Sequence, residues 1–384
     1  MKFEVPPLSL YIHLPWCVRK CPYCDFNSHT AGDAAPRSRY VAAILDDLAN
    51  EAGRADGRSV ESIFLGGGTP SLFAPEEIEQ IIDAAKNDLN VAADCEITME
   101  ANPGTVERGD LAGFQRAGVN RISLGAQSFN NEMLRALGRI HDAADSLAAF
   151  DDACAAGFDS INIDLMFALP GQSLQVAIED IQQVCALKPP HVSYYQLTLE
   201  PNTVFFKRPP GNLPDDDLSW EIQEHCHRLL RDAGYQQYEI SAFATEGHRC
   251  RHNLNYWTFG DYLAVGAGAH GKITGLDGVI RRYQKPAHPL TYIELILGGT
   301  FKPLMQALNA EDAGFEYLLN ALRLSAGFSE SAFSRSTGLK LAAIGEPLAK
   351  AKADGLIKES ANGVWQPTPL GFRFLDDLQT RFLP

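Results

Sequence analysis

The stretch Trp16-Cys17-Val18-Arg19-Lys20-Cys21-Pro22-Tyr23-Cys24 determines how the rest of this chain is interpreted. It places three cysteines at Cys-x3-Cys-x2-Cys spacing, directly after the apolar segment 8–13. Thiolates select zinc, copper(I) or iron–sulfur clusters. A structural zinc site needs four ligands, and only His13 and His29 are near enough in sequence to supply the fourth. A four-iron cluster on three thiolates keeps one iron open for chemistry, so we predict a 4Fe–4S cluster on Cys17, Cys21 and Cys24. Zinc and plain buried cysteines remain as alternatives.

Outward from this motif, short apolar segments alternate with segments of helical spacing. The strand-like segments are 8–13, 62–65, 96–100, 121–127, 160–167 and 191–199. Helical stripes of apolar residues begin at Tyr40, Ile78 and Leu174. Successive strand–helix units indicate parallel strands joined by right-handed crossovers. Six units are fewer than a closed barrel of eight, so we expect an α/β fold with a partial, open (β/α)6 TIM-like barrel. Its chemistry should lie at the carboxyl ends of the strands.

The pattern changes after residue 295. A helical stripe runs from Phe315 to Leu322, segments 355–359 and 363–367 suggest a small hairpin, and 370–382 suggests a closing helix. We therefore predict a core over 1–295 and a smaller winged-helix-like α+β domain over 296–384. Many winged helices bind DNA. Here 33 basic and 48 acidic side chains give a net charge of −15, which disfavours nucleic acid and favours a lid or interface role.

Three further features of the sequence predict where the protein is located. The eight cysteines are spread over 384 residues, the first residues, Met1 to Pro7, do not resemble a signal peptide, and no apolar run reaches membrane-spanning length. We expect a reducing, cytoplasmic location. Four further cysteines show no ligand spacing and are interpreted as small buried side chains, namely Cys95, Cys154, Cys185 and Cys226.

Polar and glycine residues mark the predicted strand ends. Gly66-Gly67-Gly68-Thr69-Pro70 follows the second strand, where glycines allow a ligand to approach the backbone closely. The Lys-Ser/Thr pair of a phosphate-binding loop is missing from it. Glu100, Gln127 and Asp164 lie at later strand ends, which converge on one mouth in this architecture. Each alone would suit a solvated loop; together with the cysteines they predict a ligand site.

The cysteine motif, its place after the first strand and the strand–helix pattern resemble the radical S-adenosylmethionine (SAM) superfamily. In that family SAM chelates the open iron, and one electron from the cluster cleaves it to a 5′-deoxyadenosyl radical. The resemblance implies that Gly67, Gly68 and Thr69 bind the methionyl amino group and that Arg139 pairs with the carboxylate; a surface salt bridge is the alternative for Arg139. The full set of implied SAM residues is Tyr11, Tyr23, Gly67, Gly68, Thr69, Glu100, Gln127, Arg139 and Asp164.

Nearly the whole chain resembles the coproporphyrinogen III oxidase-like subfamily, which contains an oxygen-independent oxidase and a group of haem chaperones. The oxidase has a fourth cysteine two positions after the third, where this chain has Phe26. It also has an amino-terminal arm, whereas this chain reaches Cys17 almost at once. Both differences disfavour oxidative decarboxylation of coproporphyrinogen.

The segment His252-Asn253-Leu254-Asn255-Tyr256-Trp257 matches the His-Asn-x-x-Tyr-Trp signature of the chaperones. Haem iron takes an axial imidazole, and porphyrin faces stack on aromatic rings. We therefore expect His252 to bind haem. A hydrogen-bonded core histidine is the alternative role, and Cys250 and His270 are rival ligands. Arg249 and Arg251 could pair with haem propionates or be simply solvated.

Together these features predict a non-enzymatic haem chaperone that carries a SAM-coordinating 4Fe–4S cluster. The alternative is a radical SAM oxidoreductase acting on coproporphyrinogen III, and a radical enzyme with another substrate is a third hypothesis. The expected cofactors are the cluster, SAM and haem. The expected partners are acceptor haemoproteins, membrane-associated ones among them; the oligomeric state, a homodimer included, is left open.

Overall fold

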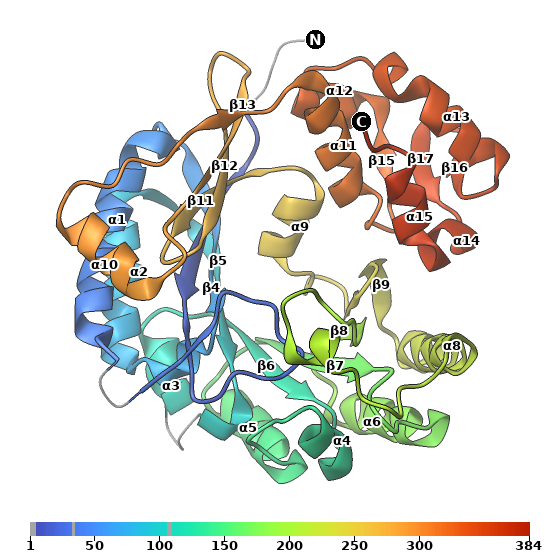
Figure 1. Cartoon of the computed structure of the whole chain (residues 1–384), viewed down its shortest axis with the longest axis horizontal. Helices are drawn as coiled ribbons and strands as arrows, with labels where there is room; N and C mark the ends of the chain where they lie inside the picture. Colours follow the sequence, from blue (N-terminus) through green and yellow to red (C-terminus); the bar gives the residue numbers. More distant parts are fainter. Residues whose placement is uncertain (1–4, 33–34, 106–109) are drawn as a thin grey trace.

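The computed structural model describes residues 5–32, 35–105 and 110–384. Residues 1–4, on which part of the signal-peptide prediction rests, lie outside this range. One twelve-stranded sheet dominates the fold, in the order β14-β13-β12-β11-β1-β4-β5-β6-β7-β8-β10-β9. Its strands curve around one side of the molecule, with helices on their outer surface (Figure 1).

The six predicted strands form the parallel centre of this sheet. They pair in sequence order as β1 (Leu8–Leu14), β4 (Ser59–Gly67), β5 (Asn90–Ala101), β6 (Arg121–Gln127), β7 (Ser160–Phe167) and β8 (His191–Gln196). In the described chain, β14 and β9 are the two ends of the strand order, so the sheet is open. The prediction of a partial, open barrel is confirmed.

Strands outside the predicted six extend the sheet at both edges. Beside β1 lies β11 (Asp261–Val265), which is also parallel, followed by the antiparallel β12 (His270–Thr274), β13 (Ile280–Gln284) and β14 (Gln306–Ala307). At the other edge, β10 (Ala242–Ala244) and β9 (Gln236–Glu239) pair antiparallel with β8 and with each other. The glycine-rich run 266–271 contains the turn from β11 into β12. Gly266 takes φ +100° there, and a Cβ atom would lie 2.3 Å from the His13 carbonyl oxygen.

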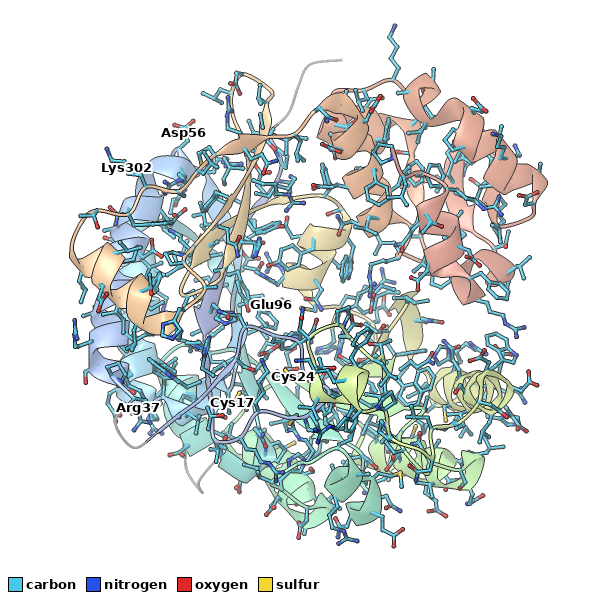
Figure 2. All side chains as sticks on the ribbon, viewed as in Figure 1. Cys17, Cys24, Arg37, Asp56, Glu96 and Lys302 are labelled. Carbon is cyan, nitrogen blue, oxygen red and sulfur yellow. The ribbon has the colours of Figure 1, made fainter. Side chains whose placement is uncertain are left out.

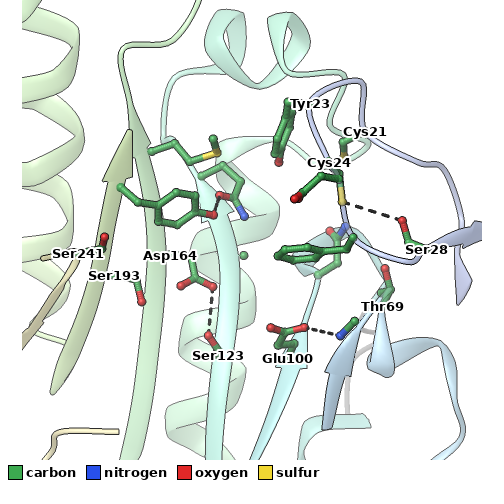
Figure 3. Close-up of a pocket in the computed structure, with 18 of the residues that line it drawn as sticks. Cys21, Tyr23, Cys24, Ser28, Thr69, Glu100, Ser123, Asp164, Ser193 and Ser241 are labelled. Atoms are coloured by element: carbon green, nitrogen blue, oxygen red, sulfur yellow. Dashed lines mark hydrogen bonds between the residues drawn. The ribbon is translucent and has the colours of Figure 1, made fainter. Parts of the chain in front are cut away.

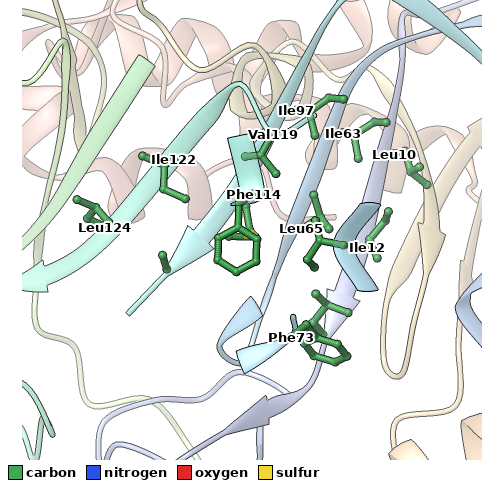
Figure 4. Packing of buried hydrophobic residues seen from close by; sticks show 14 of the residues in the cluster. Leu10, Ile12, Ile63, Leu65, Phe73, Ile97, Phe114, Val119, Ile122 and Leu124 are labelled. Carbon is green, nitrogen blue, oxygen red and sulfur yellow. The ribbon is translucent and has the colours of Figure 1, made fainter. Parts of the chain in front are cut away.

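The main core lies between the parallel strands and their covering helices. Figure 4 shows Leu10, Ile12, Ile63 and Leu65 from neighbouring strands packed close to Phe73 and Phe114. The covering helices include α1 (Arg37–Ala55), α2 (Pro75–Asp88), α3 (Asp110–Arg116), α5 (Ala143–Ala155), α6 (Leu174–Leu187) and α8 (Asp216–Asp232). The predicted apolar stripes of α1, α2 and α6 supply their buried residues, and α2 begins at Pro75 as its sequence indicates.

The carboxyl-terminal part forms a second hydrophobic cluster. Its helices are α11 (Ala310–Ala321), α12 (Glu330–Thr337), α13 (Gly345–Ala353), α14 (Pro369–Arg373) and α15 (Leu375–Thr380). They pack with a small antiparallel sheet made of β15 (Phe328–Ser329), β17 (Val364–Pro367) and β16 (Ile357–Glu359). This combination of helices and a hairpin agrees with the predicted winged-helix-like domain. The single helix expected over 370–382 is wrong, because Phe374 leaves the helical conformation and separates α14 from α15.

The predicted domain boundary between residues 295 and 296 falls inside α10 (Pro289–Leu297), whose buried Tyr292, Ile293 and Ile296 belong to the first core. The division of the chain into two domains stays a prediction. Among the described residues, no helix is long and apolar enough to cross a membrane.

Candidate functional site

A cavity of about 580 Å³ opens over the strand ends of the sheet. Its wall includes all three motif cysteines and polar groups from β4 to β8, as expected for ligand sites at the carboxyl ends of parallel strands. Figure 3 shows Cys21, Cys24 and Thr69 on one side, Ser193 and Ser241 on the other, and Glu100 and Asp164 between them.

Hydrogen bonds within the cysteine loop hold its conformation. The Cys24 amide donates to the Cys21 carbonyl at 3.2 Å, and the Lys20 ammonium donates to the Phe26 carbonyl at 2.9 Å. Short parallel strands β2 (Trp16–Cys17) and β3 (His29–Thr30) close the loop. Figure 2 shows Cys17 and Cys24 on this loop, inside the outline of the molecule. The loop therefore brings the three thiols to one wall of the cavity.

The electrostatics of these thiols are set mainly by burial. Burial raises the pKa of Cys17 and of Cys24, and hydrogen bonds from neighbouring hydroxyls, that of Ser28 among them, oppose the rise. A metal that binds here must displace thiol protons. In the described chain, no three His, Cys, Asp or Glu side chains are placed to hold a single metal ion. A four-iron cluster does not need that arrangement, because each thiolate binds a different iron.

The glycine segment after β4 lies directly under the cysteine loop. The Gly68 amide donates to the Leu14 carbonyl and the Thr69 amide to the Trp16 carbonyl, each at 2.8 Å. A Cβ atom on Gly68 would lie 2.6 Å from the Trp16 carbonyl oxygen, and Gly67 takes φ +111° against the His13 ring. Side chains would not fit at either position, so the two glycines allow this segment to pack closely against β1 and the start of the cysteine loop.

Two half-buried carboxyl groups lie across the floor of the cavity. Glu100, at the end of β5, accepts from the Gly67 amide at 3.0 Å. Burial, and secondarily the charge of Asp164, raises the Glu100 pKa to about 7. Asp164, on β7, accepts from the Ser123 hydroxyl at 3.1 Å and from the Asn162 amide at 2.8 Å, yet burial still raises its pKa. Such carboxyl groups can accept hydrogen bonds from ligand hydroxyls or amines.

Arg139 and Gln127 complete this half of the cavity. The Arg139 guanidinium donates to the Gly125 carbonyl at 2.8 Å and contacts the Cys21 sulfur at 3.7 Å, while its buried Nε has no partner among the described residues. Gln127 accepts from the Tyr195 hydroxyl at 2.8 Å and has φ 68°, a strained backbone for a residue with a side chain. An orphaned guanidinium nitrogen beside a cysteine fits an absent anionic ligand.

The structure brings together all but one of the predicted SAM residues. The residues that line the cavity are Tyr23, Gly67, Gly68, Thr69, Glu100, Gln127, Arg139 and Asp164. Tyr11 is not part of the wall; its hydroxyl hydrogen-bonds the His13 ring at 2.9 Å, and its ring stacks near Phe64. The three thiols on one wall and the orphaned Arg139 Nε fit a cluster with bound SAM, although each binding role stays a prediction.

His252 lies outside the cavity wall, on the short helix α9 (Arg251–Trp257). It is 1% exposed, and both ring nitrogens are engaged: Nδ1 with the Ser62 hydroxyl and Nε2 with the Tyr256 hydroxyl, each at 3.0 Å. Burial lowers the His252 pKa to about 3, so the ring is neutral. Haem ligation would require breaking one of these bonds and exposing the ring. His252 as a haem ligand stays a prediction, and its contacts are those of a core histidine.

The structure also shows the surroundings of the other two candidate haem ligands and of the two arginines near them. Cys250 is buried, its thiol contacts Glu96, and burial raises its pKa to about 11, whereas His270 is exposed at the start of β12. Arg251 pairs with Glu61 and Asp94, and Arg249 lies over the Tyr238 ring. Of the four cysteines predicted to be buried, Cys95 and Cys226 are buried and Cys185 is half-buried, whereas Cys154 is exposed, so the prediction is wrong for Cys154.

Part of the cavity wall escaped prediction from sequence. It is contributed by Ser193, Tyr195, Glu239, Ser241 and Arg323. Ser193 and Tyr195 alternate with buried residues along β8, a pattern that indicates a face of the sheet but not a ligand. Arg323 follows a helix of the carboxyl-terminal part, and no sequence signal relates it to the core.

Comparisons with known proteins agree with this architecture. Residues 11–184 match the Radical SAM superfamily, and residues 308–374 match the HemN C-terminal domain. The chain is 49% identical over 380 residues to the heme chaperone HemW of Escherichia coli (strain K12), covering 99% of both chains. It is 47% identical over 384 residues to HemW of Haemophilus influenzae, again covering 99% of both.

Among solved structures, coproporphyrinogen III oxidase (HemN) from Escherichia coli, described as a radical SAM enzyme, matches with a TM-score of 0.83. The match covers 98% of this chain and 90% of that one at 23% identity, so the likeness establishes the fold. Because close relatives span the whole chain at up to 49% identity, the chain belongs to the HemW family of the radical SAM superfamily.

Proposed function

We propose that the protein is a haem chaperone, which binds haem and transfers it to acceptor haemoproteins. The observation that carries this proposal is the 49% identity to a heme chaperone along 99% of both chains. The matched region therefore includes the residues of the cavity, of α9 and of the carboxyl-terminal part. We further propose that Cys17, Cys21 and Cys24 bind a 4Fe–4S cluster to which SAM coordinates.

The residues around the cavity support this cofactor proposal. A bound cluster would supply one-electron chemistry and an open iron position. The chain's own contribution is to hold and orient: Gly67 and Gly68 let the segment after β4 pack closely beneath the cysteine loop, Arg139 offers unused donors to a carboxylate, and Glu100 and Asp164 offer acceptors to hydroxyl or amino groups.

We propose that the protein is not an oxidase, and Phe26 supports this. Phe26 occupies the position two residues after Cys24, lines the cavity and is 56% exposed. A phenyl ring cannot ligate iron or donate a hydrogen atom as a thiol can. Phe26 therefore supplies an exposed apolar side chain to the cavity wall.

A second function, oxidative decarboxylation of coproporphyrinogen III, is favoured by one observation. Nearly all the predicted SAM residues meet in one cavity, which a protein that only carried haem would not need. An anaerobic assay of the reconstituted protein with SAM, a reductant and coproporphyrinogen III distinguishes the two functions. We expect no decarboxylated porphyrin while the cluster remains spectroscopically intact, and formation of that product would establish the oxidase.

Acceptor haemoproteins, including membrane-associated ones, are the proposed partners, and the proposed location is the cytoplasm. The net charge of −15 disfavours nucleic acid as a partner. The molar mass in solution, measured by light scattering, distinguishes a monomer from a homodimer.

A haem titration tests the proposed binding. Ferric haem is added to the reconstituted full chain, and the Soret absorption is followed to saturation. We expect one tightly bound haem per chain. Absence of saturable binding, with the cluster intact, would refute the chaperone proposal.

A further inference from the structure

The cavity extends well beyond the predicted SAM residues. Its far wall comes from β9, the loop before β10, α9 and the segment after α11, and comprises Glu239, Ser241, Asn253, Trp257 and Arg323. Figure 3 shows Ser241 across the cavity from Cys21 and Cys24. In Figure 1, α9 and β9 lie beside the carboxyl-terminal helices, so this wall is shared by both parts of the chain.

The two faces of α9 have different environments. His252 and Tyr256 hydrogen-bond each other, and His252 reaches β4 through Ser62. Asn253 and Trp257, also four residues apart and hence on a common face, line the cavity. The motif therefore presents an amide and an indole to the cavity, and it keeps its histidine in the core.

Arg323 is fixed against this wall. The Ser325 amide donates to the Tyr238 carbonyl at 3.0 Å, and Leu324 forms a β-bridge with Glu239. The Arg323 guanidinium lies over the Trp257 ring at 4.2 Å, and its Nη2 pairs with Glu239 at 3.0 Å. A guanidinium on an indole face forms a flat surface that carries positive charge.

The donors of this pair are incompletely used. The Arg323 Nε and the Trp257 Nε1 are buried and have no hydrogen-bond partner among the described residues. Buried N–H groups nearly always have partners, so an acceptor that reaches this wall would satisfy two otherwise unpaired donors. The Arg323 side chain is 28% exposed, and only its Nη2 pairs with Glu239. Part of the guanidinium group therefore remains accessible to a ligand.

We propose that this wall, which we call the Arg323 subsite (Glu239, Ser241, Asn253, Trp257 and Arg323), binds a carboxylate of haem, with Arg323 as the principal contact. The proposal rests on the proposed haem chaperone function and names the place in the cavity that takes the propionate end. Haem is planar and carries two propionates, which match a flat aromatic surface beside an unsaturated guanidinium. The subsite would thus bring haem into the same cavity as the cysteine loop.

The test compares ferric haem with its dimethyl ester, which keeps the ring and iron but lacks the carboxylates. Both are titrated into the reconstituted full chain under identical detergent conditions. We expect the unmodified chain to prefer haem by about tenfold or more, the range of a hydrogen-bonded charge pair. Arg323→Gln should reduce that preference to less than about twofold by the same arithmetic.

Two variants separate carboxylate binding from a structural role of Arg323. Arg373 lies over Trp220 at 3.8 Å, a matching arginine–tryptophan pair outside the cavity wall, so Arg373→Gln should retain the preference. Glu239→Gln removes a carboxylate that competes with haem for the Arg323 guanidinium, so it should raise the preference, whereas a purely structural role of the ion pair would lower it. If Arg323→Gln fails to fold, Arg323→Lys, which keeps a charge without the fork, should lower the preference instead.

The outcomes distinguish the two proposals. If the unmodified chain binds neither ligand, the chaperone function itself fails. If it binds haem but does not distinguish the ester, or if Arg323→Gln retains the preference, the Arg323 subsite is wrong while haem binding stands.

Discussion

At the residue scale, Cys17, Cys21 and Cys24 differ from the other cysteines by their shared position on one cavity wall. Replacing all three by alanine should abolish the brown absorption at roughly 400 nm after anaerobic reconstitution, because the cluster loses its thiolate ligands. Iron content and the visible spectrum are the measurements. Cys154→Ala, at an exposed cysteine on α5, is the control and should keep both. A triple variant that still binds about four irons per chain would show that the ligands lie elsewhere.

His252 illustrates how one residue can support two hypotheses. Its ring is buried and donates or accepts at both nitrogens, so His252→Ala should lower the free energy of unfolding by about 2–4 kcal/mol. Urea denaturation measures this, with Tyr256→Phe as a milder variant that removes one of the two bonds. Undiminished stability would contradict the core role. The Soret band of the haem-loaded variant then decides the ligand hypothesis, because an unchanged band removes His252 as the axial ligand.

At the element scale, the parallel strands place half-buried carboxyl groups near their ends. The pKa of Glu100 rises from 4.5 to about 7 in the folded chain, chiefly through burial, so protonation favours the folded state. Its contribution is complete below pH 4.5 and is lost as the pH rises through about 7. We therefore expect the unreconstituted chain to lose up to about 3 kcal/mol of stability over this interval through this group.

Glu100→Gln tests this expectation, since a neutral amide should flatten the decline in stability between pH 5 and pH 7.5. Denaturation across pH is the measurement. Asp180, which accepts from Ser128 and from the Phe129 amide outside the cavity, has its pKa raised by burial to about 6. Asp180→Asn should weaken the dependence of the unfolding free energy on pH at lower pH, and it should leave that dependence near pH 7 unchanged. An identical curve for Glu100→Gln would contradict the placement of Glu100.

Elements with strong local patterns were predictable from sequence. The strands 121–127 and 160–167 coincide with β6 and β7, because their apolar runs are bounded by turns on both sides. β11 was missed as a parallel strand: its five residues, Asp261–Val265, pair with β1 from the other end of the core, and local periodicity cannot reveal a partner that distant. The break at Phe374 was also missed, because helical residues stand on both sides of it.

The same distinction applies to the site. Residues at strand ends could be predicted to converge, because parallel topology requires it. Arg323 could not, because the contact between its segment and β9 depends on how the carboxyl-terminal part packs against the core. Tyr11 was assigned to the site by resemblance, and the structure places its hydroxyl on His13.

At the scale of the whole molecule, the carboxyl-terminal hydrophobic cluster includes residues from the core segment. Phe259 and Ile280 belong to the core segment but pack in the carboxyl-terminal cluster, and Phe259 meets the Tyr317 ring edge-on at 5.7 Å. Phe259→Ala should cost about 3–5 kcal/mol of stability and loosen both α9 and α11. Hydrogen exchange measures the loosening. Phe333→Ala, on α12 within the carboxyl-terminal part, should loosen α11 and α12 but not α9. Unchanged exchange in α11 after Phe259→Ala would contradict coupling between the two parts.

The most direct test of the central proposal is haem transfer. The haem-loaded, reconstituted chain is mixed with increasing concentrations of candidate apo-haemoproteins, and apomyoglobin serves as a passive scavenger. Stopped-flow absorption follows formation of the acceptor's Soret band. We expect at least one acceptor to take haem faster than apomyoglobin, at a rate that rises with acceptor concentration, because transfer occurs within a complex. If every acceptor receives haem at the concentration-independent rate of the scavenger, haem leaves the chain by simple dissociation and the protein is not a chaperone.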